Sequence, residues 1–141
     1  MSALDSLVRL HRWQLDERRR RLADLDLLAT KLHHELNRLA EEEAREQAVA
    51  SASLEAGASY GSYARRLIER RRKIEQSLTS VQQQIVAARE GLSDAFQEMK
   101  RYEIAAANRA AQRRRRLDQI QQRVLDEIGT SAFRRRGRTG G

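Results

Sequence analysis

Residues 22–39 read LADLDLLATKLHHELNRL, and this stretch decides the fold. Leucine or alanine returns here in alternating steps of three and four residues, a spacing that places the apolar side chains along one narrow stripe of an α-helix. The stripe consists of Leu22, Leu25, Ala29, Leu32, Leu36 and Leu39. Such a stripe, with charged residues between its members, is typical of a coiled-coil seam. The stripe therefore has to be buried against another helix.

The same spacing extends on both sides of this stretch, from residue 4 to residue 43. Ser2 and Asp5 resemble the capping box with which many helices begin. The apolar pattern weakens close to residue 50, ahead of two glycines. The sequence thus predicts one long helix that begins almost at the first residue.

Gly57 and Gly61 enclose a stretch rich in serine and tyrosine, which predicts a turn. A second seam follows, from Leu67 to Val124, with a stutter after Arg109 that locally unwinds a coiled coil. The predicted organisation is a single coiled-coil domain over residues 1–141, with helix one over about 3–55, a turn over about 56–61, helix two over about 62–128 and a disordered basic tail over 129–141.

The two seams predict an all-α fold, a long antiparallel two-helix coiled-coil hairpin whose second helix is the longer one. Folding the chain at the glycines pairs residues whose numbers sum to 117, so that Leu25 lies opposite Leu92 and Leu15 opposite Tyr102. A slip by a whole heptad keeps the seams paired around a different turn centre. A parallel dimer of two longer helices is the alternative arrangement.

The composition argues against an enzyme and against a membrane-spanning protein. The chain has 141 residues, of which 34% are charged and 4% aromatic, and it contains neither proline nor cysteine. Without cysteine there is no thiolate chemistry, and His11, His33 and His34 lack metal-binding spacing. The longest apolar run, four residues, is too short for a membrane span or a signal peptide. We expect no catalytic, cofactor-binding or metal-binding residue and a cytoplasmic location.

Arginine clusters are the main charged feature of a chain with net charge +8. Two of them have acidic neighbours: Arg18–Arg21 along the first helix, and Arg70–Lys73 opposite Glu41–Glu46 in the hairpin. The third cluster, Arg109 with Arg113–Arg116, has few acidic neighbours. This predicts that it docks into an acidic pocket of another protein. No aromatic residue lies among these arginines to stack on bases, so we expect no specific nucleic-acid binding.

Apolar residues outside the paired seams are the second indication of binding. Trp13 faces away from the seam with Leu10 one turn before it, and aromatic residues are frequent contact residues. Residues 114–128 have no partner in the first helix. Their apolar positions, Leu117, Ile120 and Val124, are therefore predicted to bind another protein.

The layout resembles the FliJ family of flagellar type III export proteins over about residues 4–136. The stretches that carry the resemblance are Leu4-x-x-Leu7-x-x-Leu10-x-Arg12, Arg21-Leu22-Ala23, Tyr63 with Leu67, Glu98-x-Lys100-x-x-Glu103, and Leu125-Asp126-Glu127 with Phe133-Arg134. The resemblance implies a non-enzymatic stalk that docks into the hexameric export ATPase and links it to the export gate protein and to export chaperones. It also implies a peripheral position at the cytoplasmic face of the inner membrane at the flagellar base, with only indirect membrane association.

Transferred to this chain, the resemblance assigns residues to two ends of the hairpin. The ATPase end comprises Leu7, Leu10, Trp13, Arg109, Arg113, Arg114, Arg115, Arg116, Leu117, Ile120 and Val124, and the end for the gate or chaperones comprises Tyr60, Tyr63 and Leu67. Two alternatives stay open from sequence: the equivalent stalk of a virulence type III secretion system, and a basic coiled-coil protein associated with nucleic acid.

Overall fold

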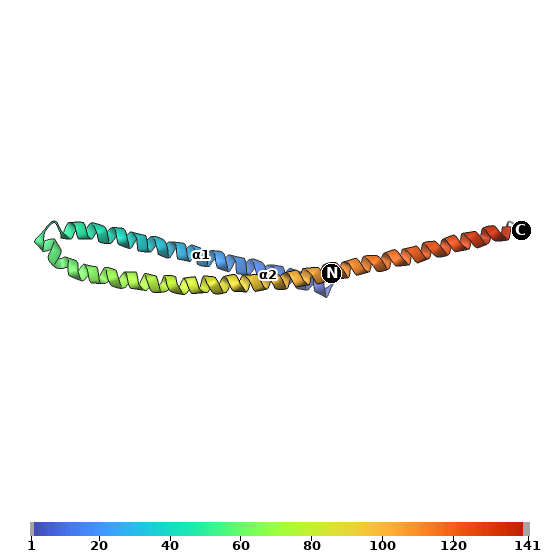
Figure 1. Ribbon diagram of the computed structural model, residues 1–141, viewed down its shortest axis with the longest axis horizontal. Coiled ribbons are helices and arrows are strands. Elements are labelled where there is room, and N and C mark those ends of the chain that lie inside the picture. The colour runs from blue at the N-terminus through green and yellow to red at the C-terminus, as the bar shows by residue number, and fades with distance from the viewer. Residues whose placement is uncertain (1, 140–141) are drawn as a thin grey trace. The chain divides into compact units, whose positions relative to one another are not determined.

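The computed structural model describes residues 2–139, and these residues form two α-helices without any strand. Helix α1 spans Ala3–Ala50 and helix α2 spans Leu54–Thr139 (Figure 1). The predicted all-α fold with a longer second helix is confirmed. Neither helix, within the described residues, combines the length and the apolar character that crossing a membrane requires.

The turn between the helices is built on serine. It lies at residues 51–53, where the Ser53 hydroxyl caps α2 by accepting a hydrogen bond of 3.1 Å from a backbone N–H of the first turn. Gly57 and Gly61 lie inside α2, and no described glycine has a positive φ. The turn predicted over 56–61 is therefore wrong, because the serine cap outweighs the preference of glycine for turns.

Helix α2 also continues further than the sequence predicted. It passes through Gly129 and reaches Thr139, where a disordered tail from residue 129 was expected, and residues 140–141 lie outside the described residues. A glycine inside an exposed helix costs only about 1 kcal/mol relative to alanine, and arginine is a good helix former. The basic last turn, with Arg136 and Arg138, also suits the negative end of the helix dipole.

Contacts within the chain divide it into two compact units. Unit 1 consists of residues 1–12 and 97–141, and unit 2 consists of residues 13–96 and includes the turn. The prediction of a single domain stays a prediction.

Unit 2 is an antiparallel hairpin with two apolar clusters between its helices (Figure 1). Leu25 of α1 packs with Val81 and Ile85 of α2, and nearer the turn Leu39 packs with Leu67 and Ile74. Four of these side chains are no more than 5% exposed: those of Leu25, Leu39, Leu67 and Val81. Burying one leucine or valine side chain stabilises a fold by about 1.5–3 kcal/mol.

The register of unit 2 differs from the predicted one. Leu25 packs between Val81 and Ile85, whereas pairing by a sum of 117 placed it opposite Leu92. The shift corresponds to about one heptad, the slip that leaves the apolar seams facing each other. It follows from the turn, which lies earlier in the chain than the glycines do.

In unit 1, the first turns of α1 pack on the part of α2 that follows residue 97. Val8 and Met99 are buried, and the rings of His11 and Tyr102 stack with their centroids 4.4 Å apart. Sequence register had predicted Leu15, one turn later, as the partner of Tyr102. The aromatic stack therefore departs from the predicted register by four residues, which is about one helical turn.

The capping box at the start of α1 is confirmed. The Ser2 hydroxyl accepts a hydrogen bond from the Asp5 N–H at 3.2 Å, and the Ser2 N–H donates to the Asp5 carboxylate at 3.3 Å. The side-chain hydrogen bond from Ser2 is the main cause that lowers the pKa of Asp5 below its usual value. A charged Asp5 in the first turn also interacts favourably with the helix dipole.

Replacing Gly61 by alanine is expected to raise the free energy of unfolding by about 0.5–1 kcal/mol, because alanine loses less backbone entropy in a helix. A Cβ atom built on Gly61 has no heavy atom within 4 Å, so nothing has to move. Urea denaturation followed by circular dichroism measures the change. At Gly57, where the Cβ would lie 3.4 Å from the Ala50 carbonyl oxygen, we expect a smaller gain. A loss of stability in Gly61→Ala would contradict a helical residue 61.

Candidate docking surfaces

Within the described residues of unit 1, the arginine cluster of α2 lies beyond the last half-buried position of that helix. Ala106 is the last half-buried residue of α2, and every residue from 107 to 138 is exposed. Within unit 1, Figure 1 shows α2 extending well past the start of α1. The overhang expected from the lengths of the two seams is therefore present in unit 1.

An apolar stripe runs along this exposed part of α2. Leu117, Ile120 and Val124 are 59%, 55% and 48% exposed, and their spacing of three and four residues places them on one face. Leu117 follows Ala106 by about three helical turns, so the stripe continues the face with which α2 packs on α1. A face used for helix packing thus runs on without an internal partner, and we call it the docking stripe.

Positive charge directly precedes the docking stripe. Arg109 and Arg113–Arg116 are all exposed on α2. Arg113 lies close enough to Asp5 for its charge to contribute to the lowered pKa of that carboxyl, after the hydrogen bonds from Ser2. Successive residues of an α-helix are rotated by about 100°, so Arg114, Arg115 and Arg116 point to three different sides of α2. A partner that surrounds the helix would meet an arginine on each of these sides.

The three apolar residues predicted from α1 are all exposed. Leu7 and Leu10, 39% and 47% exposed, lie in unit 1 together with the arginine cluster. Trp13 is 61% exposed and belongs to unit 2. Exposed apolar side chains of this size are suited to contact another protein, although single ones are common on surfaces.

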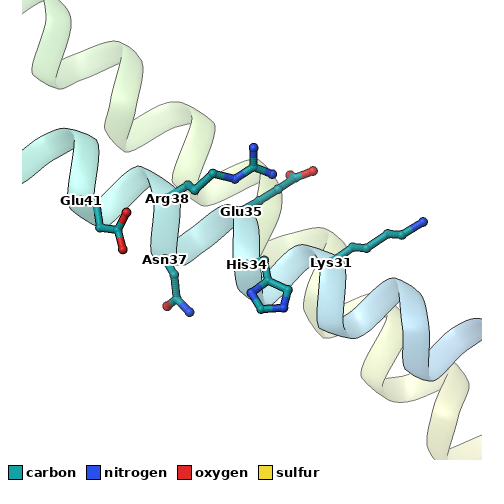
Figure 2. Close-up of a pocket in the computed structure, with 6 residues that line it drawn as sticks. All are labelled: Lys31, His34, Glu35, Asn37, Arg38 and Glu41. Carbon is teal, nitrogen blue, oxygen red and sulfur yellow. The ribbon is translucent and has the colours of Figure 1, made fainter.

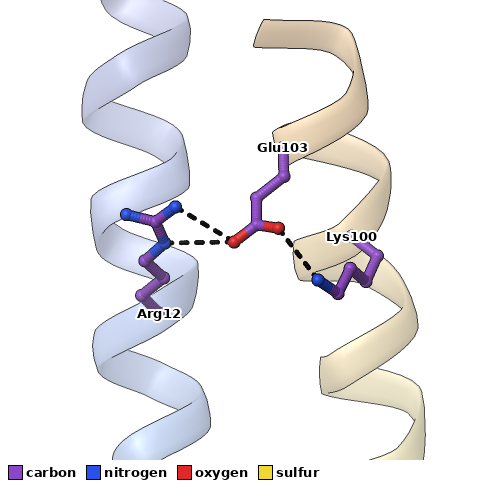
Figure 3. Close-up of polar contacts among 3 residues, drawn as sticks. All are labelled: Arg12, Lys100 and Glu103. Carbon is purple, nitrogen blue, oxygen red and sulfur yellow. Dashed lines mark hydrogen bonds and ion pairs between the residues drawn. The ribbon is translucent and has the colours of Figure 1, made fainter. Parts of the chain in front are cut away.

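A polar clamp fixes the start of α1 against α2 within unit 1, and sequence reasoning missed it. One oxygen of the Glu103 carboxylate accepts hydrogen bonds from Arg12 Nε and Nη2 at 3.2 and 3.1 Å, and the other accepts one from Lys100 at 3.2 Å (Figure 3). The hydrogen bonds from Lys100 and then Arg12 lower the pKa of Glu103. Arg12 and Glu103 are 91 residues apart in the sequence, so their pairing could be predicted only from the correct register of the two helices.

The sign of this pKa change defines the pH range in which the clamp acts. A carboxyl whose pKa is lower in the folded chain contributes stability above its unfolded pKa and loses it as the pH falls through the folded value. The clamp is therefore complete at neutral pH. It holds the last packed turns of unit 1 in place just ahead of the exposed arginines.

At the turn end of unit 2, two tyrosines lie beside a small groove. Their rings, those of Tyr60 and Tyr63, are 6.4 Å apart and tilted by 41°, and the Tyr63 hydroxyl donates a hydrogen bond of 2.7 Å to Glu42. Leu67, the third residue predicted here, is 5% exposed and packs on Leu39, so it supports this end from the core. The groove is lined by Glu46, Val49, Ala50, Ala56, Ser59, Tyr60, Tyr63 and Arg66.

Titration of tyrosine absorbance is expected to show one group with a pKa of about 12. The hydrogen bond to Glu42, followed by burial, raises the pKa of Tyr63 from 10.0 to about 12. The folded chain therefore favours the neutral phenol, and its contribution to stability is present below pH 10 and lost as the pH rises to about 12. Tyr63→Phe should remove this component. If it persists in the variant, the hydrogen bond to Glu42 does not form.

Members of the other two arginine clusters pair with acidic residues that the sequence suggested. Glu43 forms an ion pair with Arg71 across the two helices of unit 2. Along α1, Arg20 pairs with Glu17 at 2.9 Å, and Arg19 lies 3.6 Å from the carboxylate of Asp16. Exposed pairs of this kind contribute little to stability, but they neutralise charge locally.

The polar side chains that line a shallow depression on α1 of unit 2 do not point toward a common centre. Its lining consists of Lys31, His34, Glu35, Asn37, Arg38 and Glu41. In Figure 2, Glu35 and Arg38 extend to one side of the helix, whereas His34 and Asn37 extend to the other. Within the described residues, no group of three or more His, Cys, Asp or Glu side chains could hold a metal ion.

The fold first defines a class: an all-α protein of two long helices, the second of which carries the exposed docking stripe and the arginine cluster. The sequence matches the family model described as the flagellar FliJ protein over residues 1–138. The chain therefore belongs to the FliJ family, a family of non-catalytic components of flagellar type III protein export. Comparison with curated proteins and with solved structures gave no match.

Family membership confirms the resemblance found in the sequence. It also decides between the two secretion systems that the sequence left open, in favour of the flagellar one.

Proposed function

We propose that this chain acts as a stalk whose α2 enters the central opening of the hexameric export ATPase. The observation that carries the proposal is the docking stripe of Leu117, Ile120 and Val124, which continues a helix-packing face beyond its internal partner. A face of this kind is completed when another protein covers it. The central opening of a ring can cover an exposed helix over several turns.

The arginines of α2 require acidic groups in the lining of the ring. Arg114, Arg115 and Arg116 point to different sides of α2, so a ring with acidic groups around its opening can pair with them at any rotation of the helix. Such pairing speeds association and orients the helix, whereas burial of the docking stripe contributes affinity. Leu7 and Leu10, in the same unit, would extend the apolar contact.

The turn end of unit 2 is the part that we assign to the export gate protein and the export chaperones. Its support is the groove beside Tyr60 and Tyr63, which combines apolar and polar side chains. Aromatic side chains at the edge of such a groove are frequent hot spots of binding. In this arrangement the protein works at the cytoplasmic face of the inner membrane, at the flagellar base.

Co-elution with the purified export ATPase at physiological salt tests the docking stripe. We expect Leu117→Asp combined with Val124→Asp to weaken the complex at least tenfold, because it places charge in an apolar contact. Leu27→Asp combined with Val86→Asp is the matched control, since both residues are exposed on unit 2, at 56% each. Equal weakening by the two variants would argue against a specific role of the stripe.

A further inference from the structure

A second apolar face lies further along α2 than the docking stripe. Leu125, Ile128, Ala132 and Phe133 occupy positions i, i+3, i+7 and i+8, which form one side of a helix. This face is rotated by about a quarter turn from the docking stripe. Its large members are among the most exposed apolar residues of the chain, with Leu125 at 62%, Ile128 at 60% and Phe133 at 79%.

Arginine dominates the charge beside this face. Arg134, Arg135, Arg136 and Arg138 follow Phe133 directly, and residues 128–138 contain no acidic residue. From the spacing, Arg134 and Arg138 lie on the side of α2 opposite Leu125, whereas Arg136 lies within the apolar face, between the directions of Leu125 and Phe133. The acidic residue Asp126 lies earlier in the helix and accepts a hydrogen bond from Gln122.

We propose that residues 125–138 of α2 bind directly to an anionic lipid bilayer, with Phe133 and its apolar neighbours inserted at the interface. A basic helix with an apolar face lies in the plane of a bilayer, where apolar burial and attraction to anionic headgroups act together. The long arginine side chains can extend from the side of the helix toward the headgroups. This goes beyond the proposed stalk function, which involves only indirect association with the membrane.

Charge favours a bilayer over the other possible occupants of this face. A second copy of the chain would bring the same arginine-rich segments together, and like charges oppose that contact. Anionic headgroups are mobile and cover a whole surface, so they can gather around arginines that have no fixed acidic partner surface.

Co-sedimentation of the full chain with vesicles tests the proposal without the ATPase, so either proposal can fail while the other stands. At physiological salt, we expect binding to phosphatidylcholine vesicles that contain 30% phosphatidylglycerol and at least tenfold weaker binding to pure phosphatidylcholine. Phe133→Ser, and separately Arg134→Gln, Arg135→Gln and Arg136→Gln together, should each weaken binding to the anionic vesicles at least tenfold. The control, Arg19→Gln, Arg20→Gln and Arg21→Gln, removes the same charge from α1 and should change binding less than twofold.

A fluorescence measurement separates insertion from simple charge attraction. The chain has one tryptophan, so Trp13→Phe with Phe133→Trp provides a single reporter at the proposed contact. Its emission should shift to shorter wavelength when anionic vesicles are added. The proposal is overturned by an unshifted emission, by equal binding to both kinds of vesicle, by no binding, or by equal losses in the control and the Arg134–Arg136 variant.

Discussion

Reversing the charge of Arg114, Arg115 and Arg116 to glutamate is expected to weaken binding to the export ATPase about a hundredfold or more. In the proposed complex these side chains meet acidic groups of the ring, and like charges placed against each other cost several kcal/mol. All three residues are exposed, so the change should leave the helices intact. Arg113 stays unchanged because its charge acts on Asp5 at the start of α1. Titration calorimetry at physiological salt measures the affinity.

The control for this experiment reverses Arg19, Arg20 and Arg21, which changes the net charge by the same amount. Arg19 and Arg20 already have acidic neighbours in Asp16 and Glu17, so their loss removes only weak surface pairs. We expect a change of less than threefold in affinity. Equal losses in both variants would mean that the ATPase responds only to net charge, which contradicts a defined docking surface.

Replacing Leu25 or Leu39 by alanine is expected to lower the free energy of unfolding of the hairpin by about 2–5 kcal/mol. These residues are 5% and 3% exposed and belong to the two apolar clusters of unit 2. Each truncation removes buried methyl groups and leaves a cavity between the two helices of unit 2. Urea denaturation followed by circular dichroism gives the change.

Leu27→Ala is the matched control for these truncations, because Leu27 lies on the same helix and is 56% exposed. Its cost should stay within about 0.5 kcal/mol. If Leu27→Ala costs as much as Leu25→Ala, the seam does not face α2 in the way described.

The seam was predictable because helix periodicity leaves a strong trace in sequence. Leu25 and Leu39 were identified as seam residues from their spacing alone, and both are buried between the helices. The periodicity of a seam is the same after a shift of one heptad, however, so it could not exclude the register in which Leu25 packs on Val81 and Ile85. Only the position of the turn settles that choice.

The turn itself was missed because its strongest signal is a side-chain cap. Ser53 satisfies a free N–H of α2 with its hydroxyl, and this outweighs the backbone freedom of Gly57 and Gly61, which are tolerated inside the helix. The clamp between Arg12 and Glu103 was missed for a related reason, since it depends on the register.

The residues of the candidate surfaces also include some that were predictable from the sequence and some that were not. Leu117, Ile120 and Val124 were predictable, because a seam that outlasts its partner has to be exposed. Leu67 was assigned to a surface but is buried, which agrees with its position as the first residue of the second seam. The partners of the exposed residues were not predictable from the residues of this chain, because binding also depends on the surface of the other protein.

The rate of ATP turnover by the purified export ATPase, with and without this chain at physiological salt, tests the stalk proposal most directly. A stalk inside the ring stabilises the assembled hexamer, so we predict a clear rise in turnover with the full chain. The rise should be absent with the variant Leu117→Asp, Val124→Asp and present with Leu27→Asp, Val86→Asp. Unchanged turnover, together with no co-elution of the two proteins, would contradict the proposal that this chain docks into the export ATPase.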